Sequence, residues 1–242
     1  MSDSVQSSVL EFEKVVLDPD LDSGITLENL SLSCRPGGLV VIEVTRGLSL
    51  RHLPLGDAAQ GLIFPREGSV SFRGRSWADL TPPEADDARG RMGRVFDRPS
   101  WLSNLNVDEN VTLSLRHHTT RDTEEIQDEA NELSRRFRLE PPPALRPARV
   151  SAHRLRRYEW VRAFLGVPEV IVMENPLAGV YTESVALLVE AVEEFRSRGT
   201  GFLWITSDYH LLPEGSPPAD SRFRVEAGGL TILGEDSTST KN

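Results

Sequence analysis

Residues 151–181 hold a helix-like pattern that is followed directly by an apolar run. One helical face is formed by apolar residues three or four positions apart: Leu155, Tyr158, Val161 and Leu165. Gly166 and Pro168 end this pattern, which predicts a helix over about residues 154–165. Residues 170–173, VIVM, have no polar alternation, so they are typical of a strand buried on both faces of a parallel sheet.

Similar patterns predict strands and helices on either side of this segment. Alternating or continuous apolar residues mark strands over about 9–17, 25–33, 39–42, 68–74, 92–96, 201–205, 222–225 and 230–233. Thr81, followed by two prolines, marks a helix start, and further helices are predicted over 122–138 and 183–196. The Pro-rich residues 139–147 form a connector that cannot be helical throughout. Together these elements indicate an α/β fold.

The composition fits a compact domain and shows no pattern for a membrane span, a disulfide or a cysteine zinc cluster. The chain has 242 residues and a hydrophobic content of 38%, enough to supply a core. No apolar run approaches the roughly 20 residues of a membrane span, and the N-terminal residues lack the apolar stretch of a signal peptide. We therefore expect a soluble protein made in the cytoplasm. Cys34 is the single cysteine, so it predicts neither a disulfide nor a cysteine zinc cluster, but a small buried residue.

The net charge argues against one class of partner. The formal charge is −10, whereas nucleic acid binding requires a basic face. We therefore expect no nucleic acid partner. Lys14 and Lys241 are the only lysines, one near each end, and all other basic side chains apart from histidine are arginines. A lysine-dependent phosphate site in the middle of the chain is thereby excluded.

The order of the elements resembles that of ATP-binding subunits of ABC transporters. In that family an LSGGQ motif begins a helix that ends in RAL, and the next strand ends in DEP. Here VSAHR, RRYEWVRAF and VIVMENP follow in the same order, and Glu174 stands 23 positions after Ser151. LNVDENV at residues 105–111 is similar to the family's LTVxENV, and residues 115–126 resemble the lipid-trafficking Mla/Mce branch.

This resemblance implies a fold and a division of the chain. The fold would be a P-loop NTPase (RecA-like) core with an antiparallel β-subdomain and an inserted α-helical subdomain, of the ABC ATPase type. Residues 9–97 and 167–233 would form the core and β-subdomain, and residues 98–166 the helical subdomain. The polar tails at 1–8 and 234–242 are expected to be disordered.

The phosphate-binding loop that the resemblance implies has lost its chemistry. Such a loop needs glycines whose N–H groups surround phosphates, a lysine for the β- and γ-phosphates, and a Ser or Thr for Mg²⁺. Residues 43–54, EVTRGLSLRHLP, offer one glycine and no lysine. Gly47, Arg51 and His52 are left as weak candidates for nucleotide contact, and the planar guanidinium of Arg51 is not equivalent to a lysine. Pro54 is expected to interrupt the following helix beyond its first turn.

The signature segment is altered as well. The LSGGQ glycines let backbone N–H groups at a helix N-terminus approach the partner's nucleotide. Ser151, Ala152, His153 and Arg154 stand there instead, so a methyl group and an imidazole occupy that approach. Ser151 can still cap the helix. Arg154, Arg156 and Arg157 could hold an anion, but we expect them to face solvent or an acidic partner surface.

Four further positions depart from the family pattern. Asp97 stands where the family has the Gln that senses Mg²⁺ and the attacking water. Glu174 keeps a carboxylate at the Mg²⁺-binding position, but Asn175 cannot act as the general base that the family's Glu supplies. Ser207 replaces the His that senses the γ-phosphate.

These departures predict a degenerate ABC subunit, a pseudo-ATPase that is not an enzyme and needs no cofactor. Its expected partners are a membrane permease and either an active ABC ATPase subunit or a second copy of itself, on the inner face of the membrane. Two alternatives stay open: weak Mg-ATP binding or hydrolysis through Arg51 and Glu174, and a soluble interaction protein without a transporter. Ser207, Asp208 and His210 suggest a hydrolase triad, but three such residues in one loop rarely converge, so we do not expect one. No metal site is expected, because His117 and His118 diverge on a helix and have no third ligand nearby in sequence.

Overall fold

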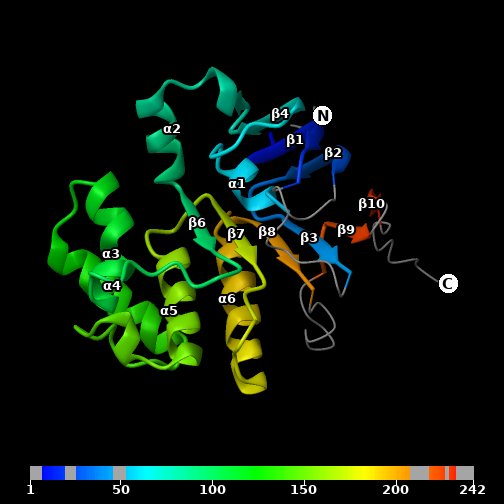
Figure 1. The fold of residues 1–242 in the computed structure, drawn as a ribbon. Helices are drawn as coiled ribbons and strands as arrows, with labels where there is room; N and C mark the ends of the chain where they lie inside the picture. Colours follow the sequence, from blue (N-terminus) through cyan, green and yellow to red (C-terminus); the bar gives the residue numbers. More distant parts are fainter. Residues whose placement is uncertain (1–6, 20–25, 46–52, 208–217, 227–228, 233–242) are drawn as a thin grey trace, which may run out of the picture.

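The computed structural model describes residues 7–19, 26–45, 53–207, 218–226 and 229–232. Within them the chain forms two sheets and a group of helices (Figure 1). The smaller sheet has the order β2-β1-β4-β5, and the larger has the order β10-β9-β3-β8-β7-β6. The two sheets and the helices around them confirm the predicted α/β class.

The small sheet is antiparallel and consists of β1 (Leu10–Leu17), β2 (Leu27–Cys34), β4 (Glu67–Phe72) and the short β5 (Arg75–Ser76). The pairing of β1 with β2 shifts register between Phe12 and Val15, so that Val15 lies opposite Leu30. Lys14 and Asn29 take positive φ angles of 48° and 53° at this irregularity. The bulge turns Leu30 into the core, which a strict two-residue alternation from Ile25 did not predict.

The large sheet carries the positions of interest. Strands β3 (Leu39–Val44), β6 (Met92–Val95), β7 (Val170–Glu174) and β8 (Gly201–Thr206) are parallel to one another. Strand β9 (Ser221–Glu226) pairs parallel with β3, and β10 (Gly229–Ile232) pairs antiparallel with β9. The four residues predicted as a buried strand lie in β7, where every residue is buried.

Six α-helices lie around the sheets in the described residues: α1 (Leu55–Ala59), α2 (Pro82–Arg89), α3 (Val107–His118), α4 (Thr123–Arg136), α5 (Ala152–Phe164) and α6 (Val185–Ser197). Three 3₁₀ turns, Trp77–Asp79, Pro147–Arg149 and Thr182–Ser184, separate some of them. Helices α3, α4 and α5 gather at one side of the large sheet (Figure 1). They fall within the segment predicted as a helical subdomain.

Two apolar cores lie on opposite faces of the large sheet. Val170, Val172 and Leu203 point into one core together with the small sheet and α1. Ile171 and Phe202, which alternate with them, point into the other core with α5 and α6. A strand covered on both faces needs apolar residues at every position, which explains the missing polar alternation in β7 and β8.

One local expectation was wrong. Pro54 does not interrupt a helix, because it stands before the first residue of α1 as its N-cap, where the missing N–H costs no helical bond. Helix α5 confirms the helix predicted over about residues 154–165, begins two residues earlier, and is buried well beyond one face, with Arg156, Glu159 and Trp160 all inside. Cys34 is buried as expected, and burial raises the pKa of its thiol to about 12.

Among the described helices, none combines the length and the apolar character that a membrane crossing requires.

Candidate functional site

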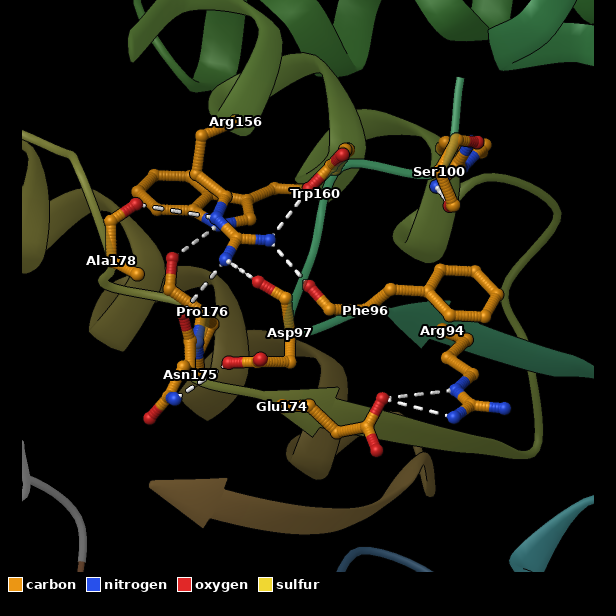
Figure 2. Close-up of polar contacts among 12 residues, drawn as sticks. Arg94, Phe96, Asp97, Ser100, Arg156, Trp160, Glu174, Asn175, Pro176 and Ala178 are labelled. Atoms are coloured by element: carbon orange, nitrogen blue, oxygen red, sulfur yellow. Dashed lines mark hydrogen bonds and ion pairs between the residues drawn. The ribbon is translucent and has the colours of Figure 1, made fainter. Parts of the chain in front are cut away.

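The candidate site lies where β6, β7 and β8 end. Glu174 is the last residue of β7, and Asn175 follows it directly. Asp97 lies two residues beyond β6, and Ser207 follows the end of β8. The fold therefore brings together the four positions predicted to have lost their catalytic chemistry. Figure 2 shows three of them beside two buried arginines, Arg94 and Arg156.

Arg94 of β6 binds the carboxylate of Glu174. Its Nη2 lies 3.0 Å and its Nε 3.2 Å from Oε2 of Glu174, a two-pronged contact (Figure 2). Its Nη1 donates to Oδ1 of Asp57 at 2.6 Å and to Oε1 of Gln60 at 3.1 Å, both in or next to α1. The side chains of Arg94 and Glu174 are only 7% and 10% exposed, so this contact is shielded from water.

Burial and charge act in opposite directions on Glu174. Burial raises the pKa of its carboxyl above the ordinary value, and the Arg94 guanidinium works against that rise. Helix α1 seals the pair from the other side. A Cβ atom at Gly56 would lie 2.5 Å from Oε1 of Glu174 and 2.6 Å from Nη2 of Arg94. Only a residue without a side chain can take this place in α1.

The residues around Glu174 do not fit a magnesium ion. Mg²⁺ requires oxygen ligands in near-octahedral geometry and usually keeps several waters. Here Oε2 of Glu174 already accepts both Arg94 contacts, and a fixed guanidinium would repel a divalent cation at this carboxylate. A side chain at Gly56 has no room, so space for bound waters is absent on that side of the pair.

Asn175 connects the neighbouring loops. Its Nδ2 donates to Oδ1 of Asp97 at 2.7 Å, and its Oδ1 accepts from the backbone N–H of Ser207 at 3.0 Å. The Ser207 hydroxyl lies 3.4 Å from the same oxygen. Asn175 has a φ of 43°, a left-handed conformation that Asn tolerates better than most residues. Its side-chain amide therefore connects the ends of β6, β7 and β8 through hydrogen bonds.

Arg156 of α5 binds the same loops through their backbone carbonyl oxygens, which was not predicted. It was predicted to face solvent or a partner, but only 6% of the residue is exposed. Its guanidinium donates to four backbone carbonyl oxygens, those of Phe96, Asp97, Asn175 and Ala178. Nη1 also lies 2.7 Å from Oε2 of the buried Glu159. Burial raises the pKa of the Glu159 carboxyl, and Arg156 opposes the rise.

The signature-like segment lies at the start of α5. Ser151 is the N-cap residue, but its side chain makes no capping hydrogen bond. Ala152 is exposed, and the His153 ring packs against the Tyr181 ring with centroids 4.8 Å apart. Arg154 Nη2 lies 3.4 Å from the Tyr158 hydroxyl. The rings of His153 and Tyr181 therefore lie near this helix start, where the family motif has glycines without side chains.

The phosphate-loop candidates Gly47, Arg51 and His52 lie outside the described residues, as do Asp208 and His210 of the suggested triad.

Sequence reasoning missed Arg94, Asp57 and the role of Arg156. The only signal for Arg94 was a charged residue inside an otherwise apolar strand, MGRV, and an unpaired buried arginine is too costly to exist. That signal demanded an acidic partner but could not name one, because Glu174 is 80 positions away.

Comparison with known proteins identifies the architecture. No family model matches the chain. The chain superposes on the ATP-binding cassette MJ0796, solved as a dimer in a post-hydrolysis state bound to ADP and Pi, with a TM-score of 0.76. The alignment covers 93% of this chain and 99% of that one at 20% sequence identity. The fold is therefore that of the ABC ATPase cassettes.

Relatives found by sequence carry names of the same class. The ribose import protein RbsA of Rhodopirellula baltica is 25% identical over 84% of this chain, and the match covers 39% of RbsA. The phospholipid transport protein MlaF of Haemophilus influenzae is 23% identical over 70% of this chain, and the match covers 63% of MlaF. The lipopolysaccharide export protein LptB of Escherichia coli K12 is 28% identical over 72% of this chain, and the match covers 78% of LptB. The chain is thus similar in sequence to ABC transporter ATP-binding subunits, as its motif order predicted.

Proposed function

We propose that this protein is a degenerate ATP-binding subunit of a membrane ABC transporter, a pseudo-ATPase that serves as a structural or regulatory partner. The observation that carries the proposal is the buried contact of Arg94 with Glu174. A protein cation stands where the family resemblance expects Mg²⁺, so Mg-ATP would have to break a shielded ion pair before it could bind productively.

The second support is the amide at position 175. A general base must accept a proton from the attacking water, and an amide cannot do so. Both polar ends of the Asn175 side chain are already used, by Asp97 and by Ser207. Loss of a catalytic base alone costs on the order of 10²–10⁴ in rate, so hydrolysis by this site would be negligible.

A groove beside the site supports docking on a permease. A cavity of about 820 Å³ lies between β6 and helices α3 and α5, and Phe96, Ser100 and Asn110 are among its lining residues. Three exposed apolar side chains lie along it: Leu102, Leu113 and Val167, which are 48%, 41% and 51% exposed. Such a groove suits an amphipathic helix, which would be supplied by a cytoplasmic loop of the permease.

A second partner would be an active ABC ATPase subunit or another copy of this chain. The related cassette MJ0796 is dimeric. In this chain the exposed Tyr181, whose ring is tilted against that of His153, would lie near such a partner, at the helix start that replaces the glycine motif. A lipid cargo is favoured by MlaF and LptB, whose names refer to phospholipid and lipopolysaccharide transport, and by the Mla/Mce-like residues 115–126.

The alternative function is weak ATP binding or hydrolysis through Arg51 and Glu174. It is favoured by the retained carboxylate at the end of β7 and by relatives that are named as ATP-binding proteins. Phosphate release from Mg-ATP by the purified chain separates the two functions. Turnover that disappears in Glu174→Ala would support the alternative, whereas turnover that survives this change would come from a contaminating ATPase.

Docking is tested by co-expression of the chain with a candidate ABC permease. The wild-type chain should co-purify with the solubilised permease, and Leu113→Asp and Val167→Asp should abolish co-purification. Leu145→Asp is the matched control, because Leu145 is 49% exposed but does not line the groove. Equal recovery of all three variants would refute the groove as the docking surface.

A further inference from the structure

Helices α2 and α3 bring three metal-ligating side chains to one place. His117 and His118 are the last two residues of α3, and Asp86 lies on the facing side of α2. Oδ2 of Asp86 is 3.7 Å from Nε2 of His117 and 3.9 Å from Nδ1 of His118. One ligand atom from each residue lies within 4.8 Å of the others. The third ligand that the sequence did not reveal is therefore supplied by another helix.

The two histidines converge although they are adjacent on a helix. His117 is 68% exposed and bends toward Asp86 from the outside, while His118, 17% exposed, reaches it from the inside. Their rings lie edge to face with centroids 4.8 Å apart. Neighbouring residues on a helix point about 100° apart. Both imidazole rings can therefore approach one common atom only if that atom lies between them, and Oδ2 of Asp86 has that position.

Gly90 makes the inner approach possible. It caps the C-terminus of α2, and a Cβ atom there would lie 2.6 Å from Cγ and 2.9 Å from Nδ1 of His118. His118 thus packs directly on the backbone of the helix that carries Asp86. A side chain at position 90 would push the imidazole away from the carboxylate.

We propose that Asp86, His117 and His118 form a binding site for a divalent transition metal, with Zn²⁺ as the best match. Two imidazole nitrogens and one carboxylate oxygen are ligands that zinc prefers, with water as the fourth. Tetrahedral zinc with bonds of roughly 2.0–2.1 Å places its ligand atoms roughly 3.3 Å apart. The distances from Asp86 to the two histidines exceed that by a few tenths of an ångström, and all three ligand atoms lie within 4.8 Å of one another. Rotation of the side chains, above all of the exposed His117, would bring the ligand atoms together around the ion.

The metal would join two parts of the chain that are separate in sequence. Helix α2 follows the small sheet, whereas α3 begins the group of helices beside the large sheet (Figure 1). His117, His118 and Gly90 also line the 820 Å³ groove between these parts. A bound ion would hold α2 and α3 together and so fix the width of the groove at that end. This site does not depend on the proposed loss of ATPase activity.

The test is a titration of the full, metal-stripped chain with Zn²⁺, followed by calorimetry, and with Co²⁺, followed by visible absorption. Wild type should bind one equivalent, and Co²⁺ should give the intense bands of a four-coordinate ion. His117→Ala and Asp86→Asn should each weaken binding at least about tenfold, because even the loss of an outer-shell partner of a metal ligand costs about 10–100-fold. Gly90→Ala should weaken it as well, because it displaces His118.

Asp87→Asn and His153→Ala are the controls, since they remove an adjacent acid and another histidine outside the cluster. Both should bind like wild type. Circular dichroism should show that all variants fold, because Asp86 and His117 are more than half exposed. Wild-type affinity in a His117→Ala/His118→Ala double variant, or no stoichiometric binding by wild type, would overturn the proposal.

Discussion

Nη2 of Arg94 lies 3.0 Å from Oε2 of Glu174, at the end of the strand where the family resemblance expects a magnesium-binding carboxylate. The arginine comes from the neighbouring strand β6 and also binds Asp57 at the start of α1. Strands β6 and β7 and helix α1 are thereby joined to one another by charge. The consequences of this contact can be measured through stability as well as through ligand binding.

Replacing Arg94 with Met should destabilise the protein by about 3–5 kcal/mol, because it leaves a buried carboxylate without its counter-charge. The measurement is denaturant-induced unfolding. Arg91→Met is the control, since Arg91 forms an exposed pair with Glu169 at 3.4 Å and should change stability by no more than about 1 kcal/mol.

The same variant should depend on pH in a defined direction. Burial already raises the folded-state pKa of Glu174 above its ordinary value of 4.5, and loss of Arg94 raises that pKa further. A carboxyl with a raised folded pKa stabilises the fold below the unfolded pKa and loses that contribution as pH rises through the folded pKa. The deficit of Arg94→Met should therefore be smaller near pH 5 than at pH 8. A deficit that grows on acidification would contradict the buried pair.

Asn175→Asp should cost about 1–3 kcal/mol, because a second carboxylate would face Asp97 where an amide donor now lies at 2.7 Å. The backbone adds no cost, since Asp tolerates a left-handed φ as Asn does. Thermal unfolding of the variant beside Ser207→Ala provides the comparison. Ser207→Ala keeps the backbone N–H contact and loses only the hydroxyl at 3.4 Å, so it should stay within about 0.5 kcal/mol of wild type.

Arg156→Met should destabilise by at least about 3 kcal/mol, since it leaves Glu159 buried without its partner and four carbonyl oxygens without a donor. Urea unfolding of Arg154→Met is the matched control on the same helix. Arg154 donates a long hydrogen bond of 3.4 Å to the Tyr158 hydroxyl, so its loss should cost less than about 1 kcal/mol. Equal effects of the two changes would show that Arg156 does not hold the loops.

The ionised Glu84 carboxylate should contribute measurably to how the free energy of unfolding changes with pH on the acid side. Arg75, and then the Thr81 side chain and N–H, lower the pKa of Glu84 from 4.5 to about 2. A lowered folded pKa contributes stability above the unfolded value, and this contribution is lost as the pH falls from about 4.5 to about 2. Unfolding midpoints of wild type and Glu84→Gln should therefore converge in that window. Arg75→Met should flatten the same limb, and a pH-independent difference would contradict the assignment.

Local apolar patterns predicted much of the fold, because the large sheet is covered on both sides. The uniform burial of β7 and β8 removes polar positions, so their strands are visible in sequence without any knowledge of their neighbours. Thr81 was also visible as a helix start, and it forms a capping box with Glu84. By contrast, the bulge at Lys14 and Asn29 breaks the alternation that strand prediction relies on, so the inward turn of Leu30 was missed.

The candidate site was predictable only where motif order located it. The order of segments identified Asp97, Glu174, Asn175 and Ser207 as altered catalytic positions of the family, and the structure places them together at the ends of three parallel strands. Their new partners were not predictable, because Arg94, Asp57 and Arg156 reach them through contacts that span tens of residues. An arginine that binds backbone carbonyl oxygens has no partner residue type at a fixed spacing in the sequence. Arg156 was therefore wrongly expected to face solvent or a partner surface.

The most direct test is equilibrium binding of ATP to the purified chain, with and without Mg²⁺, at nucleotide concentrations into the millimolar range. If Arg94 occupies the place of the ion at Glu174, calorimetry should detect no Mg²⁺-dependent binding over that range. Micromolar binding that requires Mg²⁺ would contradict this account, because the ion would then have displaced Arg94 from Glu174.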